Sequence, residues 1–227
     1  MPYVYDDGSD GSTGAGFTIA TAKADDAARL VSIEFSAFRH ETANQQLSFR
    51  DAHDASHVAR AVEAYTACLA ISTPVTRFLK VIDQESGNIV SFAKFEFKTY
   101  SDAELASPAD VGHERDPPMN RDWFALNERL RRDYVGGKTH CYIAMLATEP
   151  EHQCRGAGRL LLNQILELAD AKSLMTYLEA TDTARPLYAK HGFVRVRDIE
   201  FDAGEYGVPG LRERQTIMVR QPGAGVL

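Results

Sequence analysis

The chain has 227 residues and a net charge of −7 at neutral pH, from 25 lysines and arginines and 32 aspartates and glutamates. Hydrophobic residues make up 44% and charged residues 25%, as in an ordinary globular protein, so disorder along the whole chain is excluded. The negative charge disfavours a nucleic acid as partner, and the longest apolar run, residues 141–147, is too short to span a membrane.

Neither the cysteines nor the start of the chain indicates a metal-binding or secreted protein. Cys68, Cys141 and Cys154 lack a CxxC pair and cannot all form disulfides. Residues 1–16 contain acidic residues, glycines and serines in place of the basic and apolar segments of a secretory signal, which predicts a flexible arm. We expect a cytoplasmic protein, a monomer or homodimer, without a metal and without nucleic-acid or membrane partners.

The first half of the chain favours a strand, two helices and a hairpin. Residues 40–49 are polar and predict a connection between the helices, and the second helix ends before Pro74. Phe95 and Phe97 alternate with charged residues, which is typical of a hairpin strand. The expected elements are a strand at 17–21, helices at 27–38 and 55–71, and strands at 77–81 and 89–98.

A long insert, residues 100–138, follows the hairpin. It begins with a loop rich in proline and predicts a helix over residues 120–135 with one apolar face, formed by Trp123, Leu126, Leu130 and Tyr134. We expect Arg129, Arg131 and Arg132 on its solvated side. Two interpretations are open, a satellite helix packed on the body of the domain and a lid over a binding cleft, since long inserts in compact domains are often functional.

The second half of the chain predicts a buried strand followed by a tight turn and a strongly amphipathic helix. The strand, residues 142–148, is almost entirely apolar, which indicates burial on both faces. The later elements are a helix from 161 to about 172, a strand at 174–178, a short helix at 184–191, and strands at 193–201 and 215–220. We therefore expect a single α+β domain over residues 17–221 and a short tail, residues 222–227.

The turn after the buried strand has the properties of a phosphate site. Gly156 and Gly158 allow a ligand to approach the backbone, and the first N–H groups of the following helix have no partner within the helix. The helix dipole favours an anion there, and Arg155 and Arg159 add positive charge. Walker and dinucleotide-binding glycine patterns are both absent. A purely structural strand-to-helix turn stays open as the alternative.

The segment Gln153-Cys154-Arg155-Gly156-Ala157-Gly158 resembles the acyl-coenzyme A loop, Q/R-x-x-G-x-G/A, of the GNAT acetyltransferase superfamily. The resemblance continues through LLLNQILELAD, LEAT and RPLYAKHGF, and it is strong over residues 141–201. The insert and the last two segments look most like GNAT-like proteins of filamentous fungi. The resemblance implies a mixed, mostly antiparallel sheet of about seven strands, flanked by helices and splayed at the central strand.

The resemblance also implies roles for individual residues. The backbone of Leu146, Ala147 and Thr148 would hold pantetheine, and an N–H near Leu146 would stabilise the oxyanion. Tyr188 stands where family members place the tyrosine that protonates the departing thiolate. The pyrophosphate of acetyl-CoA, the acyl donor, would lie on the loop formed by Gln153, Cys154, Arg155, Gly156, Ala157, Gly158 and Arg159.

The general base is not identified by the sequence. Many relatives carry a carboxylate on the central strand, but residues 141–147 contain none. Glu96, Glu149 and His140 are candidates, although an ordinary structural role is expected for each. Residues 181–183 also differ from the asparagine that many relatives have after the next strand.

We therefore expect an acyl-CoA-dependent acyltransferase that moves acetyl from acetyl-CoA to a small-molecule amine by direct attack in a ternary complex. Two alternatives stay open. One is a non-catalytic acyl-CoA-binding or regulatory module, which the absent central-strand carboxylate favours. The other is transfer to protein lysines or N-termini.

Overall fold

A computed structural model describes residues 13–14, 16–71, 75–109, 111 and 117–224. Most of the arm predicted over residues 1–16 and the end of the predicted tail lie outside these residues. The helices are α1 (Ala27–Ala37), α2 (Thr42–Leu47), α3 (Ala55–Ala70), α4 (Asp102–Ala106), α5 (Pro118–Val135), α6 (Ala157–Ala171) and α7 (Arg185–Lys190). The strands are β1 (Thr13–Gly14), β2 (Phe17–Thr21), β3 (Thr76–Asp83), β4 (Ile89–Lys98), β5 (His140–Thr148), β6 (Met175–Ala180), β7 (Val194–Asp202) and β8 (Arg212–Arg220).

The strands form one mixed sheet in the order β1-β2-β3-β4-β5-β6-β8-β7. All neighbouring pairs are antiparallel except β5 and β6, which run parallel. β1 has two residues, so the sheet has seven strands of ordinary length, as the resemblance implied. The expected α+β fold class is confirmed.

The sheet opens in its middle. β5 has nine residues, but it pairs with β6 only from His140 to Tyr142, and no described strand pairs with the rest of that edge. The pairing of β4 with β5 passes from Met145 to Ile143 and leaves Ala144 out, which is a β-bulge. Because a bulge bends its strand, β5 turns away from β6 where their pairing stops. The expected splay is present.

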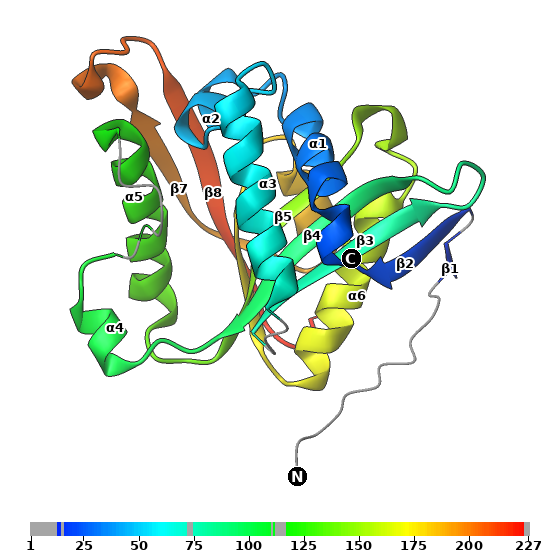
Figure 1. Ribbon diagram of the computed structural model, residues 1–227. Helices are drawn as coiled ribbons and strands as arrows, with labels where there is room; N and C mark the ends of the chain where they lie inside the picture. Colours follow the sequence, from blue (N-terminus) through cyan, green and yellow to red (C-terminus); the bar gives the residue numbers. More distant parts are fainter. Residues whose placement is uncertain (1–12, 15, 72–74, 110, 112–116, 225–227) are drawn as a thin grey trace.

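Helices cover both faces of the sheet (Figure 1). On one face, α1 and α3 pack over the β2–β5 half, where Leu30 and Ile33 of α1 meet Phe78 and Phe92. On the same side α5 stands beside β7 and β8, and its Val135 packs with Ile217 and other residues of that half. A cavity lined by residues of α2, α5, β5 and β6 lies at the splay, and it contains the candidate site.

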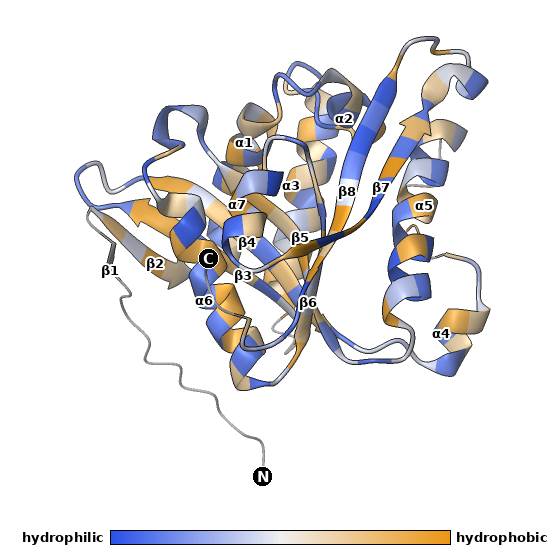
Figure 2. Ribbon diagram, turned by 180° about the vertical axis from the view of Figure 1, so that it is seen from behind, coloured by the Kyte–Doolittle hydropathy of each residue, from blue (hydrophilic) through white to orange (hydrophobic). Residues whose placement is uncertain are grey.

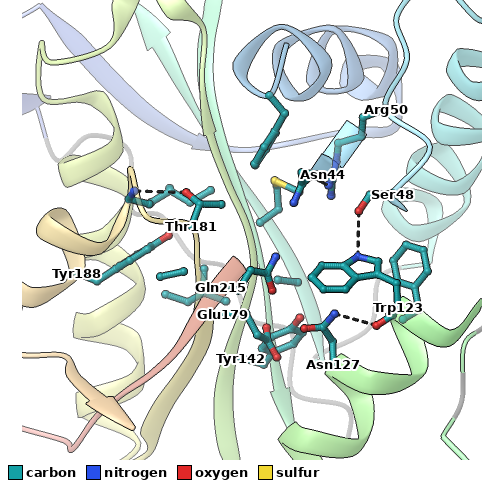
Figure 3. Close-up of a pocket in the computed structure, with 18 residues that line it drawn as sticks. Asn44, Ser48, Arg50, Trp123, Asn127, Tyr142, Glu179, Thr181, Tyr188 and Gln215 are labelled. Atoms are coloured by element: carbon teal, nitrogen blue, oxygen red, sulfur yellow. Dashed lines mark hydrogen bonds between the residues drawn. The ribbon is translucent and has the colours of Figure 1, made fainter. Parts of the chain in front are cut away.

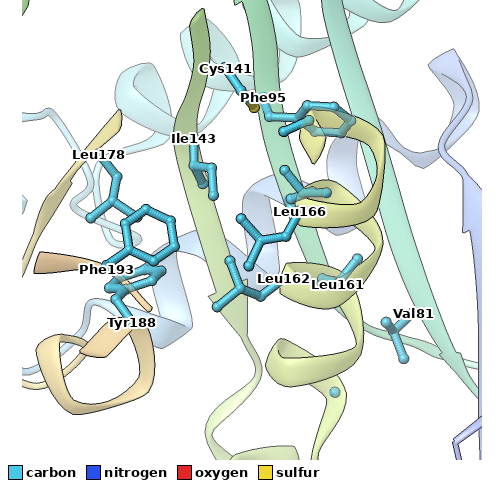
Figure 4. Close-up of a cluster of buried hydrophobic side chains, with 14 of the residues drawn as sticks. Val81, Phe95, Cys141, Ile143, Leu161, Leu162, Leu166, Leu178, Tyr188 and Phe193 are labelled. Carbon is cyan, nitrogen blue, oxygen red and sulfur yellow. The ribbon is translucent and has the colours of Figure 1, made fainter. Parts of the chain in front are cut away.

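α6 covers the opposite face and carries a regular apolar stripe, seen in Figure 2 as alternating polar and apolar segments. Leu161, Leu162 and Ile165 are fully buried against the sheet, where they meet Phe95 and Ile143 (Figure 4). This is the spacing that predicted an amphipathic helix. The burial of this apolar stripe fixes the turn before α6 against the end of β5.

Two sequence predictions about connections were wrong. The segment 40–49 contains α2, because Asn44 and Leu47 are buried and tie this short helix to the body of the domain. The loop at the start of the insert contains α4, which begins with a capping box between Ser101 and Glu104. Short helices of this kind have too few residues for a periodic apolar pattern, so their polar composition was misleading.

The expected solvated side of α5 was also wrong for two of its three arginines. Arg132 is buried and Arg131 is partly buried, and both form ion pairs with Glu128, whereas Arg129 is exposed. The Arg132 guanidinium donates to the carbonyls of Glu104, Ser107 and Pro108 around the end of α4. Burial of a charged group requires such partners, and the sequence gives no sign of them. The helix is therefore packed on the body of the domain.

Candidate active site

The glycine-rich turn lies directly after β5, as predicted. Gln153 Nε2 donates to the Thr148 carbonyl over 3.1 Å, which holds the start of the turn against the end of the strand. Gly156 has a φ of +100° and caps α6, a conformation that L side chains rarely adopt. Cys154 has a positive φ of 59° and an exposed side chain. The turn thus places the N-terminus of α6 beside the last residue of β5.

The glycine at the second position of α6 leaves this corner open. A Cβ added to Gly158 would meet Thr148 Oγ1 at 3.5 Å, an ordinary contact, so no protein packing requires the glycine there. Arg155 and Arg159 are exposed, and Arg155 lies 3.5 Å from the Asp83 carboxylate. The corner combines the backbone N–H groups at the start of α6 with the positive charge of two arginines. These features fit a pyrophosphate.

The three residues expected to hold pantetheine occupy the unpaired end of β5. Leu146 lines a cavity at the splay, whereas the Ala147 side chain is buried on the α1–α3 side. Ser91 Oγ lies 2.8 Å from both the Ala147 carbonyl and Thr148 Oγ1, so this part of β5 is held from the β4 side. The opposite edge of β5 is left without a strand partner and can bind an extended ligand.

Tyr188 lies in the same cavity as Leu146 (Figure 3). Its ring is buried against Phe193, with the ring centroids 5.6 Å apart. Burial raises the pKa of the Tyr188 hydroxyl, so it stays protonated at neutral pH. The structure therefore brings Tyr188 and the open end of β5 together at the splay, in a position where the hydroxyl can donate a proton.

The cavity also contains a carboxylate that the sequence analysis missed. Glu179, in the LEAT segment on β6, lines the cavity together with Tyr142 of β5, and its Oε1 is buried without a hydrogen-bond partner among the described residues. Burial raises its pKa, although the Arg131 charge and the Tyr142 and Tyr177 hydroxyls oppose the rise. A buried carboxylate with a raised pKa is a candidate general base. The sequence signal was a glutamate among apolar strand residues.

The three bases considered from the sequence lie outside this cavity. Glu149 forms a 2.7 Å ion pair with Arg29 of α1, and Glu96 accepts a hydrogen bond from Thr76. His140 is buried at the start of β5, stacked on Tyr100, and burial lowers its pKa. None of them is among the residues that line the cavity. An ordinary structural role accounts for all three.

The insert forms one wall of the cavity. Trp123 and Phe124 of α5 line it opposite Tyr188, and Phe38 and Arg50 border it from the α1–α2 side (Figure 3). The Asn120 side chain anchors α5 to α2 by donating to two backbone carbonyls at its end, each over 2.8 Å. α5 is thus both a packed helix and part of the site.

A second groove adjoins the cavity at Thr181 and is lined by the carboxylates of Glu41, Asp182, Glu200 and Glu213 together with Arg212 and Arg214. Burial raises the pKa of Glu213 to about 7, with Glu41 and Asp182 adding to the rise. The folded state therefore favours the protonated carboxyl of Glu213, and this preference stabilises the fold at low pH. The stabilisation is complete below pH 4.5 and is lost as pH rises through about 7.

We expect Glu213→Gln to remove this loss of stability at high pH. The amide can still accept from Asn44 Nδ2, which lies 3.3 Å from Glu213 Oε1. At pH 8 the free energy of unfolding of the variant should exceed that of the wild type by on the order of 2 kcal/mol, and at pH 4 the two should agree. Urea unfolding at both pH values measures this. An equal difference at both values would contradict the assignment.

Among the described helices, none has the length and apolar content that a membrane-spanning segment needs. In the described part of the chain, His, Cys, Asp and Glu side chains do not gather into a group of three that could hold a metal ion.

Solved structures of acetyltransferases share this fold at low sequence identity. The mosquito arylalkylamine N-acetyltransferase like 5b aligns with a TM-score of 0.63 and 12% identity, over 90% of this chain and 99% of that one. A Corynebacterium glutamicum protein, described as histone acetyltransferase HPA2 and related acetyltransferase, aligns with a TM-score of 0.59 and 19% identity, over 93% of this chain and 99% of that one. Chaetomium thermophilum Naa20, solved with a bisubstrate analogue, aligns with a TM-score of 0.53 and 16% identity, over 90% of this chain and 86% of that one.

No curated protein sequence matches the chain. The sequence model of the acetyltransferase (GNAT) family matches residues 49–193, which is more than half of the chain. The matched region includes the whole glycine-rich turn, α6, Glu179 and Tyr188. The chain therefore belongs to the acetyltransferase (GNAT) family.

Proposed function

We propose that the protein transfers an acetyl group from acetyl-CoA to the amine of a small molecule, by direct attack while both substrates are bound. One observation carries the proposal. A single cavity is lined by Leu146, at the end of β5 that does not pair with β6, by the buried Tyr188, and by Glu179, whose Oε1 has no hydrogen-bond partner among the described residues. Acetyltransferases of this family use acetyl-CoA. Transfer of its acetyl group to an amine needs a proton acceptor and a proton donor, and Glu179 and Tyr188 could fill these roles in one cavity.

The coenzyme would bind along the edge of β5 and the turn before α6. Leu146, Ala147 and Thr148 would offer backbone groups to pantetheine. The pyrophosphate would lie on the N–H groups between Cys154 and Arg159, with Gln153 fixing the turn. When bound, acetyl-CoA supplies the thioester carbonyl that the amine attacks.

The residues of the cavity would move two protons. Glu179 takes a proton from the incoming ammonium, and the freed lone pair forms the N–C bond. A backbone N–H near Leu146 stabilises the charge that develops on the carbonyl oxygen. As the C–S bond breaks, the Tyr188 hydroxyl donates its proton to the sulfur, and the nitrogen releases its second proton, which restores the Tyr188 hydroxyl and leaves the neutral amide. A covalent enzyme intermediate is unnecessary, since the amine attacks the thioester directly while both substrates are bound.

Two features favour a catalytic site for small acceptors over the alternatives. A non-catalytic acyl-CoA-binding module was favoured by the absence of a carboxylate on β5, but Glu179 supplies one from β6. For the acceptor, α5 and α2 are tied together beside the cavity and border it with Trp123 and Phe124 of α5 and Asn44 of α2. A protein lysine or N-terminus would need a broad open approach, which this wall restricts.

The proposal is tested by turnover of acetyl-CoA with a panel of amines, comparing wild type with Tyr188→Phe. We expect the variant to bind acetyl-CoA as the wild type does and to lose about tenfold in kcat, a modest loss because a thiol has a pKa near ~8.5 and is a fair leaving group unaided. The exposed Tyr134→Phe is the matched control. Coenzyme binding without turnover of any amine would overturn the proposal in favour of a binding module.

A further inference from the structure

Three buried oxygen atoms in the cavity lack hydrogen-bond donors among the described residues. They are Asn127 Oδ1 of α5, Glu179 Oε1 of β6 and Gln215 Oε1 of β8. The Asn127 amide has a fixed orientation, because its Nδ2 donates to the Trp123 carbonyl over 2.9 Å. Buried acceptors without donors are uncommon in folded proteins. Three of them on one cavity indicate a ligand that brings several donors.

The arrangement of the three residues suggests what this ligand donates. In Figure 3, Glu179 and Gln215 lie between Tyr188 on one side and Trp123 and Asn127 on the other. A primary ammonium carries three N–H bonds. After Glu179 removes one proton, two remain for Asn127 and Gln215, and the lone pair is left free to attack. A secondary amine has one N–H at that stage and leaves one buried oxygen unpaired.

The rest of the cavity wall restricts the body of the acceptor. Phe38, Trp123 and Phe124 offer aromatic surface, and the Trp123 ring is held by a 3.3 Å hydrogen bond to Ser48. Arg50 is the sole cation among the described lining residues, and its guanidinium already binds Glu34 and Asn44. An acceptor carboxylate would therefore enter this cavity without a free cation to pair with.

We infer that the acceptor is a primary amine on an aromatic or apolar body without a carboxylate, and that Asn127 and Gln215 determine this specificity by accepting its two remaining N–H bonds. The inference rests on the proposed function and adds the class of its substrate. It also gives the insert a role, since α5 supplies both Asn127 and the aromatic wall.

Three related probes test the inference. We expect kcat/KM for 2-phenylethylamine to exceed that for N-methyl-2-phenylethylamine by about tenfold, the usual effect of one hydrogen bond in a buried polar site, and that for phenylalanine by more. Equal rates with the N-methyl compound or with phenylalanine would overturn the inference but keep the proposed function. Faster turnover of 1,5-diaminopentane would instead assign recognition to the groove of Glu41, Asp182 and Glu213. No acetylation of any amine would remove the proposed function itself.

Two variants on different elements separate specificity from folding. Asn127→Leu and Gln215→Met each remove one acceptor and keep similar size. We expect each to lower kcat/KM for 2-phenylethylamine about tenfold and leave that for the N-methyl compound nearly unchanged, so that the preference for the primary amine disappears. Arg129→Leu, at an exposed position of the same helix, is the control and keeps the preference. If Asn127 and Gln215 were merely structural, their substitution would lower kcat/KM for both amines together. If both variants kept the preference for the primary amine, the inference would be overturned.

Discussion

Glu179→Gln is expected to lower kcat by at least about 100-fold at neutral pH while the affinity for acetyl-CoA stays at the wild-type value. The amide keeps the shape of the carboxylate but accepts no proton, so the acceptor would remain an ammonium without a lone pair. Glu179 lines the cavity from β6, and the turn before α6 is not among the lining residues, so coenzyme binding should be spared. Single-turnover kinetics and titration calorimetry measure the two quantities separately.

The pH dependence gives an independent check of the same residue. Because burial raises the pKa of Glu179, the acid limb of the wild-type kcat/KM profile should lie above the ordinary range of a glutamate. Activity falls as pH decreases through that pKa, since the protonated carboxyl cannot act as a base. In Glu179→Gln this limb should vanish from the residual activity. The neutral amide also removes a buried charge, so the variant should be no less stable than the wild type.

Two further substitutions make the result decisive. Glu167→Gln, on the exposed side of α6, should leave both kcat and the pH profile unchanged. Glu149→Gln removes a carboxylate that the structure places in an ion pair with Arg29, and it should also leave turnover near the wild-type level. If Glu149→Gln loses activity and Glu179→Gln does not, the base considered from the sequence is the right one, and the assignment of Glu179 is wrong.

The contrast between these two glutamates shows where sequence reasoning about the site stopped. The turn and α6 have local signals, namely glycines before an amphipathic stripe, which depend only on neighbouring residues. Tyr188 became a candidate through the resemblance of the segment RPLYAKHGF to the acetyltransferase family, and its role stays a prediction. Glu179 depends on how far β6 separates from β5, which is a property of strand pairing between distant segments.

The same limit explains the errors around the insert. Arg131 appeared to be on a solvated side because α5 was considered alone. In the fold, its guanidinium lies 3.7 Å from the centre of the Tyr142 ring and donates to the Tyr100 hydroxyl over 2.8 Å. Tyr142 comes from β5 and Tyr100 from the segment after β4, so the partners become visible only when the sheet is assembled. The fold class, by contrast, followed from periodicity within single elements.

Gly158→Leu is expected to weaken acetyl-CoA binding by about 100-fold, the loss of one or two hydrogen bonds to a charged group, without unfolding the protein. The glycine is the second residue of α6, where a Cβ would meet Thr148 Oγ1 at an ordinary 3.5 Å. Leucine favours a helix by up to about 1 kcal/mol over glycine, so the free energy of unfolding should stay the same or rise. The leucine side chain would occupy the corner proposed for the pyrophosphate.

The choice of glycine decides whether the result can be interpreted. Substitution of Gly156, at a φ of +100°, would strain the turn itself, and lost binding would then say nothing about the ligand. Asn163→Leu, at an exposed position of the same helix, introduces the same residue away from the corner and should bind acetyl-CoA normally. Calorimetric titration of all three proteins with acetyl-CoA measures the difference. Unchanged affinity in a folded Gly158→Leu variant would show that the turn only connects β5 to α6, and the coenzyme would have to bind elsewhere.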